Sequence, residues 1–131
     1  MHLLPWRERS YDLAVRVIAR GTLNQFVRNR VNGKLQTMVK AHLDAWYAEA
    51  ARATWKNSAE LKQQYRSASI VSSERVVFNI KGNEYRLVVA INYPHQVLLI
   101  VWLGTHKEYD KIDVKKVRYD KNRYADSTDS K

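Results

Sequence analysis

The 131-residue sequence contains no cysteine, which excludes disulfide bonds and thiolate metal sites. Its longest apolar run, residues 97–103, is far too short to cross a bilayer, and the first residues lack the apolar core of a signal peptide. His and carboxylate residues nowhere have the close spacing of a metal site, so we expect no metal and no other cofactor. We therefore expect a cytoplasmic protein with no membrane partner.

Acidic residues are scarce relative to basic ones. The chain has 23 Lys and Arg against 13 Asp and Glu, a formal net charge of +10 and a pI near 9.9. Such a charge attracts polyanions. The excess lies mainly in the first 65 residues, which hold 11 basic and 5 acidic side chains. This pattern favours a nucleic acid partner and leaves an acidic protein partner open.

The apolar periodicity predicts the element order β-α-α-β-β-β. A β-branched run predicts a strand over residues 13–19, and helical spacing predicts one helix from Thr22, a possible N-cap, to Asn32 and a second from about 34 to 52. A short helical turn follows Asn57. Alternation of period two then predicts strands over 75–80 and 85–92, and the apolar run 97–103 predicts a third strand covered on both sides.

This order predicts one α+β domain, a small and mainly antiparallel sheet covered on one face by a helical hairpin. The other face is expected to be concave and partly open, and therefore to be the ligand site. We interpret residues 1–12 as an N-terminal extension, 13–117 as the domain and 118–131 as a flexible C-terminal tail, because the last residues are polar and mix charges of both signs.

The stretch "GTHKEYDKI" follows the last strand and gathers groups that can transfer protons. If residues 105–110 form a helical turn, His106 shares a face with Tyr109 and Asp110. Alternation places Arg86 on the open sheet face, and the loop with Arg66 is able to fold over it. The alternative is a structural corner, in which the same side chains pack, cap or face solvent.

Cations beside proton-transfer groups suit phosphate chemistry. When an RNA 2′-hydroxyl attacks the adjacent phosphorus, negative charge develops on the phosphorane oxygens and the 5′-oxygen needs a proton. Guanidinium and ammonium groups stabilise that charge. A Tyr or Lys among cations can have its pKa lowered toward neutrality and serve as the proton donor.

Five segments together resemble the HigB toxin family of bacterial type II toxin–antitoxin modules. They are "VRVIARGTL", "AWYAEA", "TWKNSAELKQQYRSAS", "RVVFNIKGNEYRLVVAINY" and "GTHKEYDKI", and the resemblance covers about residues 14–114. It implies a RelE/ParE-like fold and an mRNA interferase, an endoribonuclease that acts on translated mRNA at the ribosome. It also implies a HigA-like antitoxin as partner.

RelE-like enzymes use clustered Arg, Lys, His and Tyr side chains and no metal, which by analogy implies roles for residues of this chain. Arg66 and Arg86 are expected on the scissile phosphate, Lys107 on a neighbouring phosphate, and His106 or Tyr109 in proton transfer. Further RNA-binding cations are expected at Lys62, Arg75 and Lys81. The alternative function is a non-catalytic RelE/ParE-fold protein that inhibits a protein target such as gyrase or regulates nucleic acid.

Overall fold

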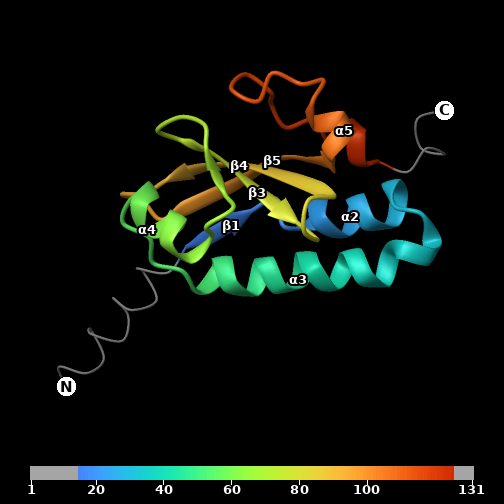
Figure 1. Ribbon diagram of the computed structural model, residues 1–131, viewed down its shortest axis with the longest axis horizontal. Coiled ribbons are helices and arrows are strands. Elements are labelled where there is room, and N and C mark those ends of the chain that lie inside the picture. The colour runs from blue at the N-terminus through green and yellow to red at the C-terminus, as the bar shows by residue number, and fades with distance from the viewer. Residues whose placement is uncertain (1–14, 126–131) are drawn as a thin grey trace.

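A five-stranded sheet forms the centre of the protein, in a computed structural model that describes residues 15–125 (Figure 1). The strand order is β1-β5-β4-β3-β2, and only β1 and β5 run parallel. The strands are β1 (Arg16–Ile18), β2 (Ser69–Ile70), β3 (Arg75–Ile80), β4 (Tyr85–Asn92) and β5 (Val97–Thr105). The predicted α+β class and mainly antiparallel sheet are confirmed, and among the strands the sequence interpretation missed the two-residue β2.

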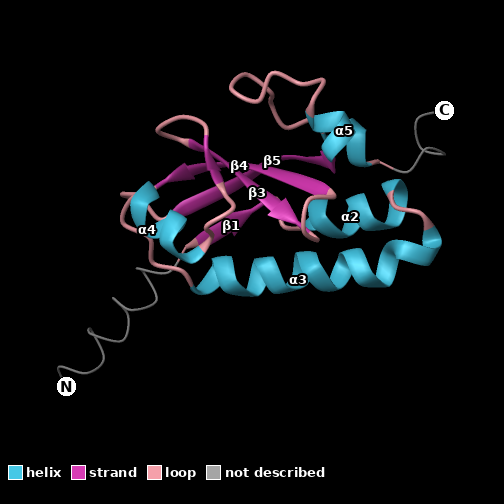
Figure 2. Ribbon diagram, viewed as in Figure 1, coloured by secondary structure: helices cyan, strands magenta, loops and turns pink. Residues whose placement is uncertain are grey.

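Two antiparallel helices cover one face of the sheet, as the side view in Figure 2 shows. The helices are α2 (Gly21–Arg30) and α3 (Gln36–Arg52), joined through the 3-10 turn η1 (Gly33–Leu35); α4 (Ser58–Gln64) follows. Phe26 and Leu43 from the helices pack with Phe78, Leu87 and Leu103 from the strands, all at most 1% exposed. Burial of this apolar surface is the main favourable term that holds the helices to the sheet.

The start of α2 differs from the predicted cap. Arg20 occupies the N-cap position without a side-chain hydrogen bond, and Thr22 lies inside the helix. The buried Thr22 hydroxyl donates a hydrogen bond of 3.0 Å to the Tyr119 hydroxyl, 97 residues further along the chain. Thr22 therefore joins the helix to the C-terminal segment, a role that local sequence cannot reveal.

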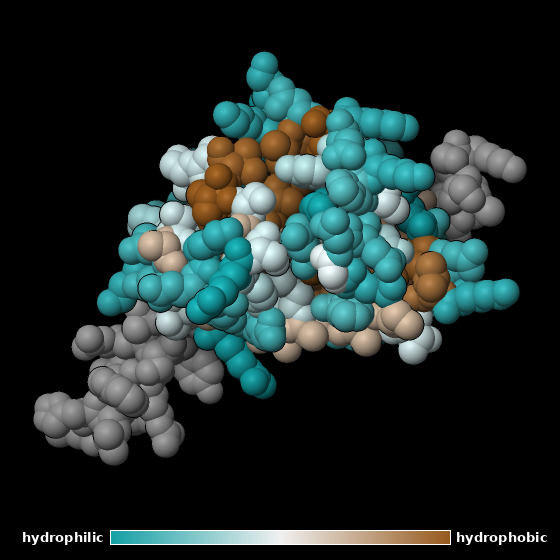
Figure 3. All heavy atoms as spheres, in the orientation of Figure 1, coloured by the Kyte–Doolittle hydropathy of each residue, from teal (hydrophilic) through white to brown (hydrophobic). Residues whose placement is uncertain are grey.

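The second sheet face is covered more than the sequence predicts. Val77, Val88, Val101 and Trp102 form a second apolar cluster there. Residues that follow β5 pack against it, namely Tyr109 in α5 (His106–Tyr109) and Ile112, Val114 and Val117 beyond it. Figure 3 shows hydrophobic surface at this side of the molecule, bordered by hydrophilic side chains. The face expected to be open and concave is therefore partly covered by the segment that follows β5.

The C-terminal segment docks on the edge of β5. β1 pairs only with residues 97–99 of that strand. Further along, the Tyr124 hydroxyl accepts a hydrogen bond of 2.9 Å from the Leu103 N–H, and Arg123 donates to the Leu103 carbonyl oxygen from Nε (3.3 Å) and Nη2 (3.1 Å). Tyr124, in the 3-10 helix η2 (Lys121–Tyr124), is fully buried. A flexible tail was expected from residue 118; the structure describes residues 118–125 of it, with Tyr124 buried, while the extension 1–12 and residues 126–131 lie outside the described part. No helix within residues 15–125 is long and apolar enough to span a membrane.

Candidate functional site

The short helix α5 begins with a complete capping box. The Thr105 hydroxyl accepts a hydrogen bond from the Glu108 N–H (3.2 Å), and Glu108 Oε1 accepts one from the Thr105 N–H (2.9 Å). Such reciprocal bonds satisfy N–H groups at the start of a helix that have no partner within it. The predicted helical turn is confirmed, and His106 and Asp110 lie at its two ends, with His106 Nε2 3.6 Å from Asp110 Oδ1.

Register across the sheet brings the Arg86 strand position beside α5. Arg86 in β4 pairs with Asn79 in β3 on one side and with Gly104 in β5 on the other. Gly104 is two residues before His106, whose N–H donates 2.9 Å to the Glu84 carbonyl oxygen of the β3–β4 turn. Arg86, the turn and α5 therefore meet at one end of the sheet.

The Arg86 guanidinium is fixed by the turn that precedes it. Nη1 donates to the carbonyl oxygens of Asn83 (3.1 Å) and Tyr85 (3.3 Å), and Nη2 donates to Asn83 Oδ1 (2.6 Å). A guanidinium has five N–H donors. Three described hydrogen bonds thus leave donors for an anion, with the charge held in place by the turn.

Tyr109 lies within the electrostatic influence of Arg86. Burial raises the pKa of the Tyr109 phenol, the positive Arg86 guanidinium opposes that rise, and the Asp110 carboxylate adds to it. The net direction is upward, because burial disfavours the phenolate. The idea of a Tyr pKa lowered by cations is therefore wrong for Tyr109, which is protonated at neutral pH and is able to donate a proton.

The other candidate side chains, Arg66, Lys107 and His106, belong to segments at the same end of the sheet as Arg86. Arg66 is exposed in the loop after α4, next to Ser67, whose carbonyl oxygen accepts a hydrogen bond of 3.4 Å from Asn79 Nδ2. Since Asn79 pairs with Arg86, the Arg66 loop borders the same end of the sheet. Lys107 is exposed on α5, and the His106 side chain is 45% exposed.

Three further cations proposed for RNA binding have partners within the chain. Arg75 Nη1 donates to the carbonyl oxygens of Val114 (2.9 Å) and Val117 (2.6 Å), which anchors the segment after α5. Lys81 Nζ forms an ion pair of 2.8 Å with Glu84, and Lys62 Nζ donates to the Ala68 carbonyl oxygen. These contacts give Arg75 a structural role, and RNA binding by all three stays a prediction.

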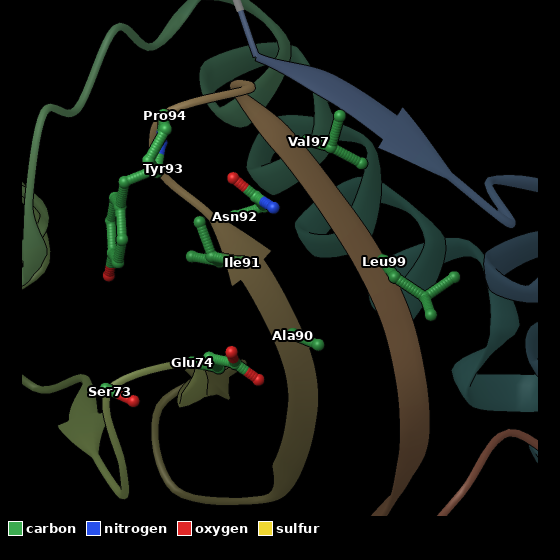
Figure 4. Close-up of a pocket in the computed structure, with 9 residues that line it drawn as sticks. All are labelled: Ser73, Glu74, Ala90, Ile91, Asn92, Tyr93, Pro94, Val97 and Leu99. Atoms are coloured by element: carbon green, nitrogen blue, oxygen red, sulfur yellow. The ribbon is translucent and has the colours of Figure 1, made fainter.

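A hollow on this sheet face lies at its other end. A cavity of about 500 Å³ is lined by residues of the β4–β5 turn and its strands together with Ser73 and Glu74 (Figure 4). The Tyr93 phenol points toward Ser73 and Glu74, and Val97 and Leu99 form an apolar side. This cavity contains no cation, so it lacks the charge that the phosphate hypothesis requires. Within residues 15–125, no group of three or more His, Asp and Glu side chains is arranged to hold a metal ion.

Comparison with protein families identifies the domain. The HigB toxin family, described as the RelE-like toxic component of a toxin–antitoxin system, matches residues 39–112, more than half of the chain. The chain belongs to the HigB toxin family. A HigB toxin is one member of a toxin–antitoxin pair, so its partner is an antitoxin. No protein in a curated collection matches the chain significantly.

Two residues beside this candidate site, Glu108 and Arg123, were not predicted from the sequence. Glu108 binds Arg30 Nη2 at 2.7 Å and Arg123 Nη2 at 3.2 Å, so it joins α5 to α2 and to η2. Glu108 had a recognisable signal, because Thr105 and Glu108 have the T-x-x-E spacing of a capping box. Arg123 had none, since its contacts are about 20 residues away along the chain.

Proposed function

We propose that this HigB toxin is an endoribonuclease that cleaves translated mRNA by attack of a 2′-hydroxyl on the adjacent phosphodiester. The main support is the pairing of Arg86 with Gly104 just before α5, together with the effect of the Arg86 charge on Tyr109. A fixed cation and a protonated phenol are then close together at one end of the sheet. Membership of a RelE-like toxin family agrees with this chemistry.

The reaction requires one proton to leave and another to arrive. The 2′-oxygen forms a bond to phosphorus while the bond from phosphorus to the 5′-oxygen breaks, giving a 2′,3′-cyclic phosphate and a 5′-hydroxyl. We assign removal of the 2′-hydroxyl proton to the His106 imidazole, which is about half-exposed and whose Nε2 lies 3.6 Å from Asp110 Oδ1. The Tyr109 phenol, which is protonated at neutral pH, donates the proton to the leaving 5′-oxygen, and the positive Arg86 guanidinium opposes the rise in its pKa that burial causes.

Charge on the phosphorane is stabilised by Arg86, with Arg66 approaching from the bordering loop and Lys107 on a neighbouring phosphate. Arg86 suits the first role because three hydrogen bonds hold it in place before the substrate binds. Preorganised donors of this kind contribute about 10²- to 10³-fold to a rate. Exposed Arg66 and Lys107 depend on the substrate for their orientation and are expected to contribute less.

The test is in vitro cleavage of a defined message, with and without translating ribosomes, by wild type and by Arg86→Ala. The 5′ ends of the products are mapped and their terminal groups identified. Arg28→Ala is the matched control, because Arg28 is an exposed cation of the helical layer and its loss lowers the net charge equally. We expect 5′-hydroxyl ends, a rate about 10²-fold lower for Arg86→Ala and little change for the control.

Three results would count against the proposal. Intact message under conditions that arrest growth would favour the non-catalytic alternative. Equal rates for Arg86→Ala and wild type would remove Arg86 from the site. Cutting of free RNA at the rate seen on ribosomes would refute translated message as the specific substrate.

A further inference from the structure

One carboxylate joins the short helix α5 to two distant parts of the chain. Glu108 Oε2 lies 2.7 Å from Arg30 Nη2 in α2, and Oε1 lies 3.2 Å from Arg123 Nη2 in η2. The same Oε1 also accepts the Thr105 N–H of the capping box. The first turn of α5 is therefore held by two cations as well as by its own cap.

Arg123 is also linked to Tyr109, one of the proposed reacting residues, through the Trp102 ring. Its guanidinium lies 4.6 Å from the centre of the Trp102 ring, and the Trp102 and Tyr109 ring centres are 6.3 Å apart. Arg123 is itself held by the Leu103 carbonyl oxygen and by its buried neighbour Tyr124. Arg123 thus supports both the start of α5 through Glu108 and its end through Trp102.

The electrostatics agree with a carboxylate that stays charged between these cations. Burial acts to raise the pKa of Glu108, but the hydrogen bonds from the Thr105 N–H and from Arg30 and the charges of Arg123 and Arg30 outweigh it. The pKa of Glu108 is therefore lowered. The arrangement is a small ion-pair network, and cooperating charges with good geometry contribute more than an isolated surface pair.

We propose that Arg123 and Arg30 are positioning residues, which act through Glu108 and Trp102 to fix His106 and Tyr109 in the orientation that RNA cleavage requires. This inference rests on the proposed function. Both arginines lie outside residues 39–112, the range matched by the family, so family membership gives them no role. Neither needs to contact the RNA, because each already contacts the segment that carries the reacting side chains.

The experiment compares wild type with Arg123→Gln, Arg123→Lys, Glu108→Gln and Lys121→Gln. Lys121 is the matched control, because it is an exposed cation of the same 3-10 helix. Steady-state cleavage of a defined message gives kcat and KM separately. Amide hydrogen exchange of residues 105–109 reports the order of α5 without any need for cleavage, and circular dichroism confirms that each variant is folded at the assay temperature.

We expect Arg123→Gln to lower kcat about tenfold with KM nearly unchanged, since ångström-scale misplacement of reacting groups can cost up to about 10²-fold. Exchange at residues 105–109 should rise about tenfold as the segment opens more often. Arg123→Lys keeps the charge next to Glu108 and should recover part of kcat. Glu108→Gln keeps an oxygen for the Thr105 N–H but loses both ion pairs, so it should resemble Arg123→Gln. Lys121→Gln should match wild type.

The inference is overturned if Arg123→Gln leaves either kcat or exchange at wild-type values, or if it raises KM alone, which would make Arg123 an RNA contact. If Arg123→Gln fails to fold, Glu108→Gln decides by the same criteria. Failure of the proposed function has a different signature, because wild type would then leave RNA intact while the exchange of residues 105–109 still shows whether Arg123 holds α5.

Discussion

Replacing Tyr124 with phenylalanine removes a buried hydrogen-bond acceptor. The Tyr124 side chain is fully buried, and its hydroxyl accepts the Leu103 N–H at 2.9 Å. Phenylalanine keeps the ring, which packs edge-on against Phe26 with centroids 6.5 Å apart, and loses only the oxygen. The Leu103 N–H then remains buried without an acceptor, which costs about 1–3 kcal/mol.

The loss is large enough to measure by thermal or denaturant unfolding. An unfolding entropy of about 2.1 cal/mol/K per residue converts 1–3 kcal/mol into a fall in Tm of about 4–11 °C for a chain of this length. Tyr47→Phe is the matched control, because it keeps the ring under the Arg20 guanidinium (4.1 Å from the ring centre) and its hydroxyl forms no hydrogen bond within residues 15–125. We expect the control to cost less than about 0.5 kcal/mol. A Tyr124→Phe protein within about 0.3 kcal/mol of wild type, or a control that costs as much, would refute the reasoning.

Three further predictions concern the same end of the sheet. A Cβ on Gly104 would overlap the Trp102 ring and the Arg123 guanidinium, so Gly104→Ala should lower the free energy of unfolding by about 1–3 kcal/mol in urea titrations, whereas Gly33→Ala, with no atom within 4 Å of its added Cβ, should not. Because the pKa of Glu108 is lowered in the folded protein, its carboxylate adds stability at neutral pH that is lost as the pH falls below about 4.5. Between about pH 5 and 3 the Tm of Glu108→Gln should therefore fall less steeply than that of wild type. An equal fall of Tm with pH in both proteins would contradict the ion pairs. Tyr109→Phe keeps the contact with Trp102 but removes the phenol, and its kcat should fall about 10²-fold or more with an unchanged Tm; an unchanged kcat would assign proton donation elsewhere.

The sheet and the position of Arg86 follow from local patterns. Leu87 and Val89 alternate with Arg86, and a period of two fixes which side of the strand faces the helices. The helical hairpin follows equally from apolar spacing on α2 and α3 and the Asn-Gly pair between them. The predicted turn at 105–110 was confirmed because short-range spacing determines a single helical turn.

Features that depend on distant contacts were not predictable in the same way. A register shift at Val88 and Val89 puts both Val101 and Trp102 on the second face, and the apolar run 97–103 carries no mark of it. Polar residues around Tyr124 gave the segment the composition of a solvated tail, although one aromatic side chain docks it. The second face is partly covered because Ile112, Val114 and Val117 pack against the apolar residues that strand 97–105 places there. The spacing of these three residues fits neither a helix nor a strand, so the sequence pattern did not predict this contact.

The short reach of β1 gives the docked C-terminal segment a protective role. Beyond residue 99, the outer backbone groups of β5 have no neighbouring strand among the described residues, and Tyr124 and Arg123 occupy those of Leu103. Without these side chains, an apolar stretch of unpaired strand would be free to recruit a strand from another molecule. Arg123 and Tyr124 thus also block pairing of this part of the β5 edge with a strand from another molecule, and a chain that ends before residue 118 should associate with itself more readily.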